Sequence, residues 1–172
     1  MKVRFGLIAA AFTLIAMPAF AQGKLNDAQI AHVAYTAGTL DVEAGKQALA
    51  ISKNPDVRAF AEQMVKDHTA VNDQALALVK KLKVTPEDNA TSKSLTTQAA
   101  AKHAELAKLS GAAFDKAYLA NEIAFHKTVN GALETTLIPS ASNAELKSLL
   151  QTGLKLFQGH QQHAEQKAAA LK

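Results

Sequence analysis

Helix-capping and helix-breaking residues recur along this chain, and they constrain its fold more than any other feature. Asn26 is a capping residue that predicts a first helix continuing to about Lys53. The pair Asn54–Pro55 then predicts the cap and first turn of a second helix, which continues to about Lys83. No alternation of apolar and polar residues between turn dipeptides suggests a strand, so the sequence predicts an all-α protein.

Signals for helix boundaries also occur in the second half of the chain. Residues 84–89 have the composition of a loop. Thr91–Leu109 is expected to form a weakly apolar helix, and Ala112–Leu137 a longer and more apolar one that Pro139 stops. The pattern Ser-x-x-Glu over 142–145 predicts a capping box for a last helix that runs to the C-terminus.

Four of these helices are long and amphipathic, and short connections join the first pair and the last pair. Short connections favour two antiparallel hairpins. The helix at 91–109 lies between the hairpins and is long enough to run back along the bundle. We therefore expect a ferritin-like four-helix bundle with an additional crossover helix; an up-down bundle with a side helix is the alternative topology.

The N-terminus has the organisation of a secretory signal peptide. Lys2 and Arg4 precede a short apolar run over 5–17, and the small-residue pattern Ala19-Phe20-Ala21 follows. The expected cleavage after Ala21 makes residues 1–21 a signal peptide and residues 22–172 one helical bundle domain, located in the periplasm.

Composition excludes several classes of function. The chain contains no cysteine, so it has neither disulfides nor thiolate metal sites. Without Lys2 and Arg4 it keeps 17 of its 19 basic residues against 15 acidic ones, and aromatic residues do not alternate with the lysines, so no nucleic-acid partner is expected. We also expect no stable membrane insertion after cleavage and no organic cofactor. No catalytic motif or phosphate-binding glycine-rich loop is present, which favours a binding protein over an enzyme.

Each long helix carries at least one ionisable residue within its apolar stripe. Burial of such a group is unfavourable unless it is paired, neutral or bound to something. Counting residues from the expected turns places the candidates on the first, second and fourth helices near mid-bundle, whereas His160 is offset by roughly 12 Å. The candidate site residues are Glu43, His68, Glu122, His126 and His160.

Imidazole and carboxylate groups on facing helices are how helical bundles bind metals. This histidine-rich set suits Zn, Cu or Fe better than Mg or Ca. Asp67 is placed to orient a ligating imidazole, or else lies in solvent. The sequence thus predicts a transition-metal site with a role in metal buffering or stress response. The alternative is a metal-free envelope-stress or interaction module whose buried Glu/His network sets the helix register.

Several ordered segments resemble a family of exported bacterial ferritin-like proteins catalogued as domain of unknown function 4142. The resemblance implies a ferritin-like fold and an extracytoplasmic location, while the activity of the family is not established. The segments are DVEAGK at 41–46, NPDVRAFA at 54–61, MVKDHT at 64–69 and LSGxxFDKAYL at 109–119, with His126 and His160. The polar positions typical of the family correspond to Glu43, Asp67, His68, His126 and His160.

The chain departs from the wider di-iron pattern of ferritin-like proteins. That pattern contains Glu-x-x-His, in which a glutamate lies three residues before each ligating histidine. Here Val65, Ile123 and Phe157 lie three residues before His68, His126 and His160. An oxygen-activating di-iron centre is therefore not expected.

Overall fold

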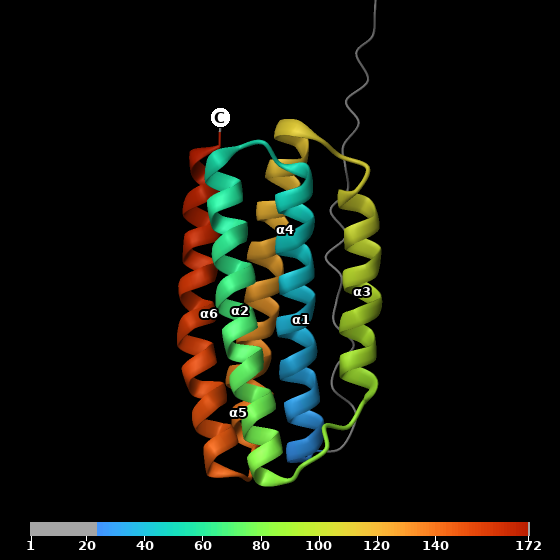
Figure 1. Ribbon diagram of the computed structural model, residues 1–172, viewed down its shortest axis with the longest axis vertical. Helices are drawn as coiled ribbons and strands as arrows, with labels where there is room; N and C mark the ends of the chain where they lie inside the picture. The colour runs from blue at the N-terminus through green and yellow to red at the C-terminus, as the bar shows by residue number, and fades with distance from the viewer. Residues whose placement is uncertain (1–23, 172) are drawn as a thin grey trace, which may run out of the picture.

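A computed structural model describes residues 24–171, and the predicted signal peptide at 1–21 lies outside them. Within this range the fold is all-α, with five long helices and no strand, as predicted (Figure 1). A short π-helix, η1, and a single turn, α5, join the last two long helices. The elements are α1 (Asp27–Ile51), α2 (Pro55–Leu82), α3 (Ala90–Leu106), α4 (Gly111–Ala132), η1 (Leu133–Leu137), α5 (Ile138–Ser140) and α6 (Ala144–Ala170).

The predicted caps of the first two helices are confirmed. The Asn26 side chain caps α1, and the Asn54 side chain accepts hydrogen bonds from the backbone N–H groups of Asp56 and Val57 at the start of α2. The predicted cap of the last helix is wrong by one residue, because Asn143 rather than Ser142 caps α6. The backbone N–H of Ser142 instead donates to the Asp27 carboxylate, at 2.8 Å, which ties the start of α6 to the start of α1.

Four of the long helices, α1, α2, α4 and α6, form a bundle, and the fifth, α3, packs on its outside (Figure 1). α1 and α2 form one antiparallel hairpin, and α4 and α6 form another. α3 packs mainly along α1 and carries the chain back along the length of the bundle, so α2 and α4 run in the same direction (Figure 1). The predicted crossover helix is therefore present.

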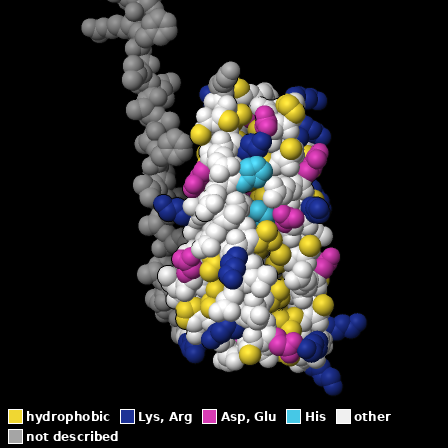
Figure 2. Space-filling model, turned by 90° about the vertical axis from the view of Figure 1, so that its left-hand side faces the viewer, with side chains coloured by type: hydrophobic (Ala, Val, Ile, Leu, Met, Phe, Trp, Pro, Cys, Tyr) yellow, Lys and Arg dark blue, Asp and Glu magenta, His cyan; other side chains and the backbone are white. Residues whose placement is uncertain are grey.

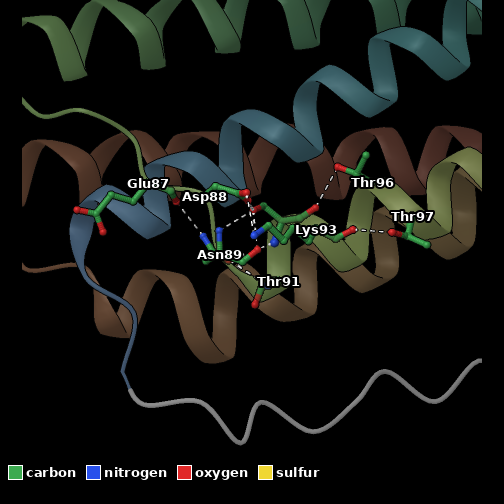
Figure 3. A network of polar contacts seen from close by, with 8 residues as sticks. Glu87, Asp88, Asn89, Thr91, Lys93, Thr96 and Thr97 are labelled. Carbon is green, nitrogen blue, oxygen red and sulfur yellow. Dashed lines mark hydrogen bonds and ion pairs between the residues drawn. The ribbon is translucent and has the colours of Figure 1, made fainter.

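A polar network joins the loop before α3 to the first turns of that helix (Figure 3), and two hydrogen bonds attach this loop to α1. Asn89 caps α3 by accepting from the N–H groups of Thr91 and Ser92, and its amide donates to the backbone oxygen of Gln29 in α1, at 3.3 Å. The loop adds a backbone hydrogen bond from Glu87 to Ala28, at 3.1 Å. These contacts position the crossover without using any residue of the bundle interior.

The helix after α4 does not stop at Pro139, contrary to the prediction. In a regular α-helix, the proline ring would clash with the carbonyl four residues earlier, that of Thr135. Here that turn is the π-helix η1, in which the N–H of Ile138 donates to the oxygen of Leu133, five residues back. The wider π turn accommodates the proline, and the helix ends at Ser140.

The bundle interior contains two separate apolar clusters, one toward each end. The first surrounds the start of α1, η1 and the start of α6, and it includes Ile30, Leu133 and Leu150. The second surrounds the α1–α2 turn and the start of α4, and it includes Phe60 and Tyr118. Between them, every helix of the bundle contributes a buried polar residue, so the interior is divided by one polar layer.

Candidate metal centre

The polar layer contains five buried ionisable side chains from four helices. Asp41 comes from α1, His68 from α2, Glu122 and His126 from α4, and His160 from α6. Their exposed fractions are at most 3%, which makes them as buried as the leucines on either side. Four of the five residues predicted from the sequence therefore lie together in the bundle interior.

The position of Glu43 was predicted wrongly. Its side chain is exposed on α1, and Asp41 occupies the interior position instead, 1% exposed. The reason is the phase of the helix: the buried face of α1 runs through small residues such as Ala37, Ala44 and Ala48. These have little hydropathy, so a stripe chosen by its larger apolar residues is rotated away from the true interior face.

The three histidine rings converge from three helices. The ring centroids of His68 and His126 are 5.5 Å apart, those of His68 and His160 are 5.2 Å apart, and those of His126 and His160 are 5.5 Å apart. One ligand atom from each lies within 4.8 Å of the others. His160, which was expected to be offset along the bundle, is a full member of the cluster.

One carboxylate oxygen lies close to two of these rings. Oδ2 of Asp41 is 3.5 Å from Nε2 of His68 and 3.6 Å from Nε2 of His126. Glu122 approaches from the other side, with its Oε2 at 3.8 Å from Nδ1 of His126. Asp41, Glu122 and His126 form a second group of potential ligands that shares His126 with the histidine triad.

Hydrogen bonds outside the cluster determine which imidazole nitrogens are free. Nδ1 of His126 lies 3.0 Å from the backbone oxygen of Glu122, which can only accept, so Nδ1 carries the proton and Nε2 has the lone pair. Nε2 of His160 lies 3.0 Å from the carboxylate of Asp67, so this nitrogen donates and Nδ1 has the lone pair. Both lone pairs belong to nitrogens that are buried.

The atoms facing the cluster have no hydrogen-bond partner among residues 24–171. This holds for both oxygens of Asp41, both nitrogens of His68, Nε2 of His126, Nδ1 of His160 and Oε2 of Glu122. Buried polar atoms are normally paired, and each unpaired one is unfavourable by about 1–3 kcal/mol. The residues that carry these atoms fall into two overlapping groups, each of which could hold a metal ion.

The electrostatics of the layer keep it uncharged at neutral pH. Burial raises the pKa of the Asp41 carboxyl to about 8. Burial, with the nearby Asp41, also raises the pKa of Glu122 well above its usual value. Burial lowers the pKa of His68 to about 2 and that of His126 to about 4, so the contacts of Asp41 with these rings are not ion pairs.

Aromatic rings enclose the cluster at both ends. Phe157 stacks on His68, with ring centroids 4.6 Å apart and an interplanar angle of 12°. At the other end the hydroxyl of Tyr118 is buried, and the carboxyls of Glu122 and Asp41 raise its pKa further after the main effect of burial. The donors are therefore held between two apolar walls.

The sequence left open whether Asp67 orients an imidazole or lies in solvent. Asp67 is 24% exposed and contacts His160, so it is the neighbour that orients an imidazole. Gln47 faces α3 rather than the cluster: its amide donates to the backbone oxygen of His103, at 2.9 Å. It helps to attach the crossover helix.

The sequence profile of the family described as "Domain of unknown function (DUF4142)" matches residues 14–166. The chain belongs to this family. Comparison with the curated proteins and with the solved structures found no match. In the described part of the chain, no helix is both long and apolar enough to cross a membrane.

Proposed function

We propose that this DUF4142 protein binds one transition-metal ion in its polar layer, through Asp41, His68, His126 and His160, with Glu122 as a further donor. The observation that carries this proposal is the spacing of the unpaired atoms. A tetrahedral ion with bonds of about 2.0–2.1 Å holds its ligand atoms about 3.3–3.4 Å apart. The two contacts of Oδ2 of Asp41, at 3.5 and 3.6 Å, are close to that separation.

A metal-free network explains the same atoms less well. Hydrogen bonds between these groups would bring their heavy atoms to about 2.7–3.2 Å. The distances from Asp41 to the rings are longer, and both nitrogens of His68 are left without a partner within the described residues. The two contacts of Asp41 with the rings are thus too long for hydrogen bonds, and they match the ligand spacing around a cation that Asp41, His68 and His126 would share.

The donor set selects the class of metal. Three neutral imidazoles and a carboxylate suit Zn, Cu or Fe, whereas Mg and Ca prefer oxygen ligands. A bound divalent ion would displace the proton of Asp41, because a nearby positive charge reverses the effect of burial on a carboxyl pKa. If Glu122 also ionises, the two carboxylates balance the charge of the ion.

An orienting carboxylate next to a ligating histidine is a recurring feature of metal sites. The Asp67–His160 pair has this arrangement, and Asp67 is the member of the pair that reaches the surface. Figure 2 views the side of the molecule formed by α2 and α6 and shows histidine atoms at the surface among acidic and basic side chains. We take this side as the route by which the ion reaches the layer.

The cellular role that we propose combines this site with a ferritin-like bundle and with export. The antiparallel hairpins joined by a crossover support the ferritin-like arrangement, and the signal pattern that ends at Ala21 supports the periplasm. A metal-binding bundle in that compartment suits metal buffering or a stress response.

Calorimetric titration of the mature protein with Zn²⁺, Cu²⁺ and Fe²⁺ tests the proposal. We expect one ion per chain for at least one metal, and a thermal stabilisation that rises to about 4 kcal/mol when the free ion is about 1,000 times Kd. His126→Leu should abolish both effects, whereas His103→Leu, which changes a half-buried histidine on α3, should leave them unchanged.

Two results would contradict the metal site. If the wild-type protein binds none of the three metals, the metal-free network is favoured. His126→Leu should then lower the free energy of unfolding by about 1–3 kcal/mol. Unchanged stoichiometric binding by His126→Leu would place the ion elsewhere in the protein.

A further inference from the structure

A cavity of about 60 Å³ lies beside the polar layer, in the half of the bundle that contains η1. The residues lining it belong to the first half of α1, the second halves of α2 and α4, η1, the first half of α6 and the start of α3. It therefore lies among the bundle helices and extends to α3, and its lining does not include Asp67.

Small side chains create this cavity. The lining contains alanines from three helices, where larger apolar side chains would fill the space. They are Ala34, Ala37, Ala75 and Ala132. Gly153 gives an independent measure of the space: a Cβ atom added to it would meet only the Phe157 ring, at 3.4 and 3.6 Å. A buried glycine in a close-packed helix bundle normally lies against a neighbouring helix. At Gly153 the added atom would contact only Phe157 of the same helix and no residue of a neighbouring helix.

The lining is mostly apolar, and its polar residues are Asn72, Thr91 and Thr128 together with three members of the polar layer. Leucine, valine, alanine and phenylalanine side chains form most of the wall, and Asp41, His68 and His126 form one end. A molecule in the cavity would therefore have apolar contacts on its sides and the donor atoms of the layer at one end.

We propose that this cavity binds a small, uncharged apolar molecule of the size and polarity of dioxygen, directly beside the metal ligands. Cavities lined by apolar side chains bind xenon or small hydrocarbons, and apolar side chains form most of this lining, so an apolar molecule suits the part of the cavity away from the polar layer. A volume of about 60 Å³ is too small for an acyl chain. An anionic ligand is disfavoured because no lysine or arginine lines the cavity, so its charge would be buried without a partner. The consequence for metal chemistry rests on the proposed function, whereas the cavity and its occupant do not.

Methyl NMR spectra of the metal-free mature protein under xenon pressure test the inference. We expect saturable shifts of the methyl groups that line the cavity, such as those of Val71 and Leu150, and no shift for Val57 or Leu119 in the other apolar cluster. Under dioxygen pressure the same lining methyl protons should relax faster, because dioxygen is paramagnetic.

A variant that fills the cavity can be compared with a variant that makes the same substitution elsewhere on the same helix. Gly153→Val should abolish the xenon shifts, whereas Gly159→Val, which makes the same change at an exposed position of α6, should keep them. Should Gly153→Val fail to fold, as judged by circular dichroism, Ala37→Val fills the same space from α1.

The outcomes separate this inference from the metal site. Absence of saturable shifts, shifts that persist in a folded filling variant, or xenon binding without faster relaxation under dioxygen would overturn the cavity proposal. Xenon binding by a protein that ignores Zn²⁺, Cu²⁺ and Fe²⁺ would overturn the metal site and leave the cavity proposal intact.

Discussion

Replacing Asp41 with asparagine should affect the metal-free and metal-bound forms in opposite directions. In the metal-free protein the Asp41 carboxyl is buried and its pKa is raised to about 8. The native state thus keeps it protonated at neutral pH, while the unfolded state ionises it. Asparagine is neutral in both states and has nearly the same shape, so Asp41→Asn should stabilise the metal-free protein near neutral pH. With metal, the same change removes an anionic ligand and should weaken binding.

The magnitude follows from the two pKa values. Below the unfolded pKa, near 3.9, aspartate is neutral in both states and the two proteins should be similarly stable. As the pH rises, the wild type loses about 1.4 kcal/mol of stability per pH unit relative to the variant, until the native pKa is passed near pH 8. The expected advantage of Asp41→Asn at pH 7 is therefore on the order of 4 kcal/mol.

Urea unfolding of both proteins in chelator, at intervals from pH 4 to 9, measures this difference. Glu43→Gln is the matched control, since it makes the same chemical change two residues along α1 on an exposed side chain and should have little effect. Comparing the variants at each pH removes contributions common to both, including loss of stability as unfolded histidines take up protons. A destabilised Asp41→Asn in chelator would refute the reasoning, because it would mean that Asp41 is ionised and paired with a charged histidine.

Two further predictions concern the orienting carboxylate and export. Asp67→Asn should weaken metal binding by about 10–100-fold without changing the stoichiometry, because it leaves His160 in place but removes its charged partner; Asp73→Asn, an exposed position on the same helix, is the calorimetric control. Protein expressed with its full N-terminus should be recovered from the periplasm beginning at Gln22, and mass spectrometry that finds Met1 in that fraction would contradict the signal peptide.

The parts of the fold that could be predicted are those that depend on local chemistry. Asn26 and Asn54 satisfy backbone N–H groups within their own first turns, so their role is visible without knowledge of the rest of the chain. The all-α class and the crossover helix follow from such caps and from the connection lengths. The presence of a polar layer was also predictable, because histidines within apolar stripes stand out by their chemistry.

The side of α1 that faces the interior could not be found by hydropathy. Gly45 explains why: a Cβ added there would lie 2.8 Å from the Val65 side chain and 3.1 Å from the backbone oxygen of Ala61. α1 approaches α2 closely through small residues, and these contribute little to a hydrophobic stripe. The usable signal was the spacing of Ala37 and Ala44, which lie four residues before and three residues after Asp41 and therefore share a helix face with it and not with Glu43.

The predicted position of His160 along the bundle axis was wrong because of the connection after α4. Counted from Pro139, His126 and His160 differ by about eight residues in their distance from the turn, an offset of roughly 12 Å. In the structure η1 lets the helix continue to Ser140, and the connection falls at 141–143. Counted from its centre, the two histidines differ by about two residues, an offset of roughly 3 Å along the helix axes. The histidine triad therefore depends on a π turn seven or more residues away from His126, since a helix that ended at Pro139 would place His160 about two turns beyond the other ligands.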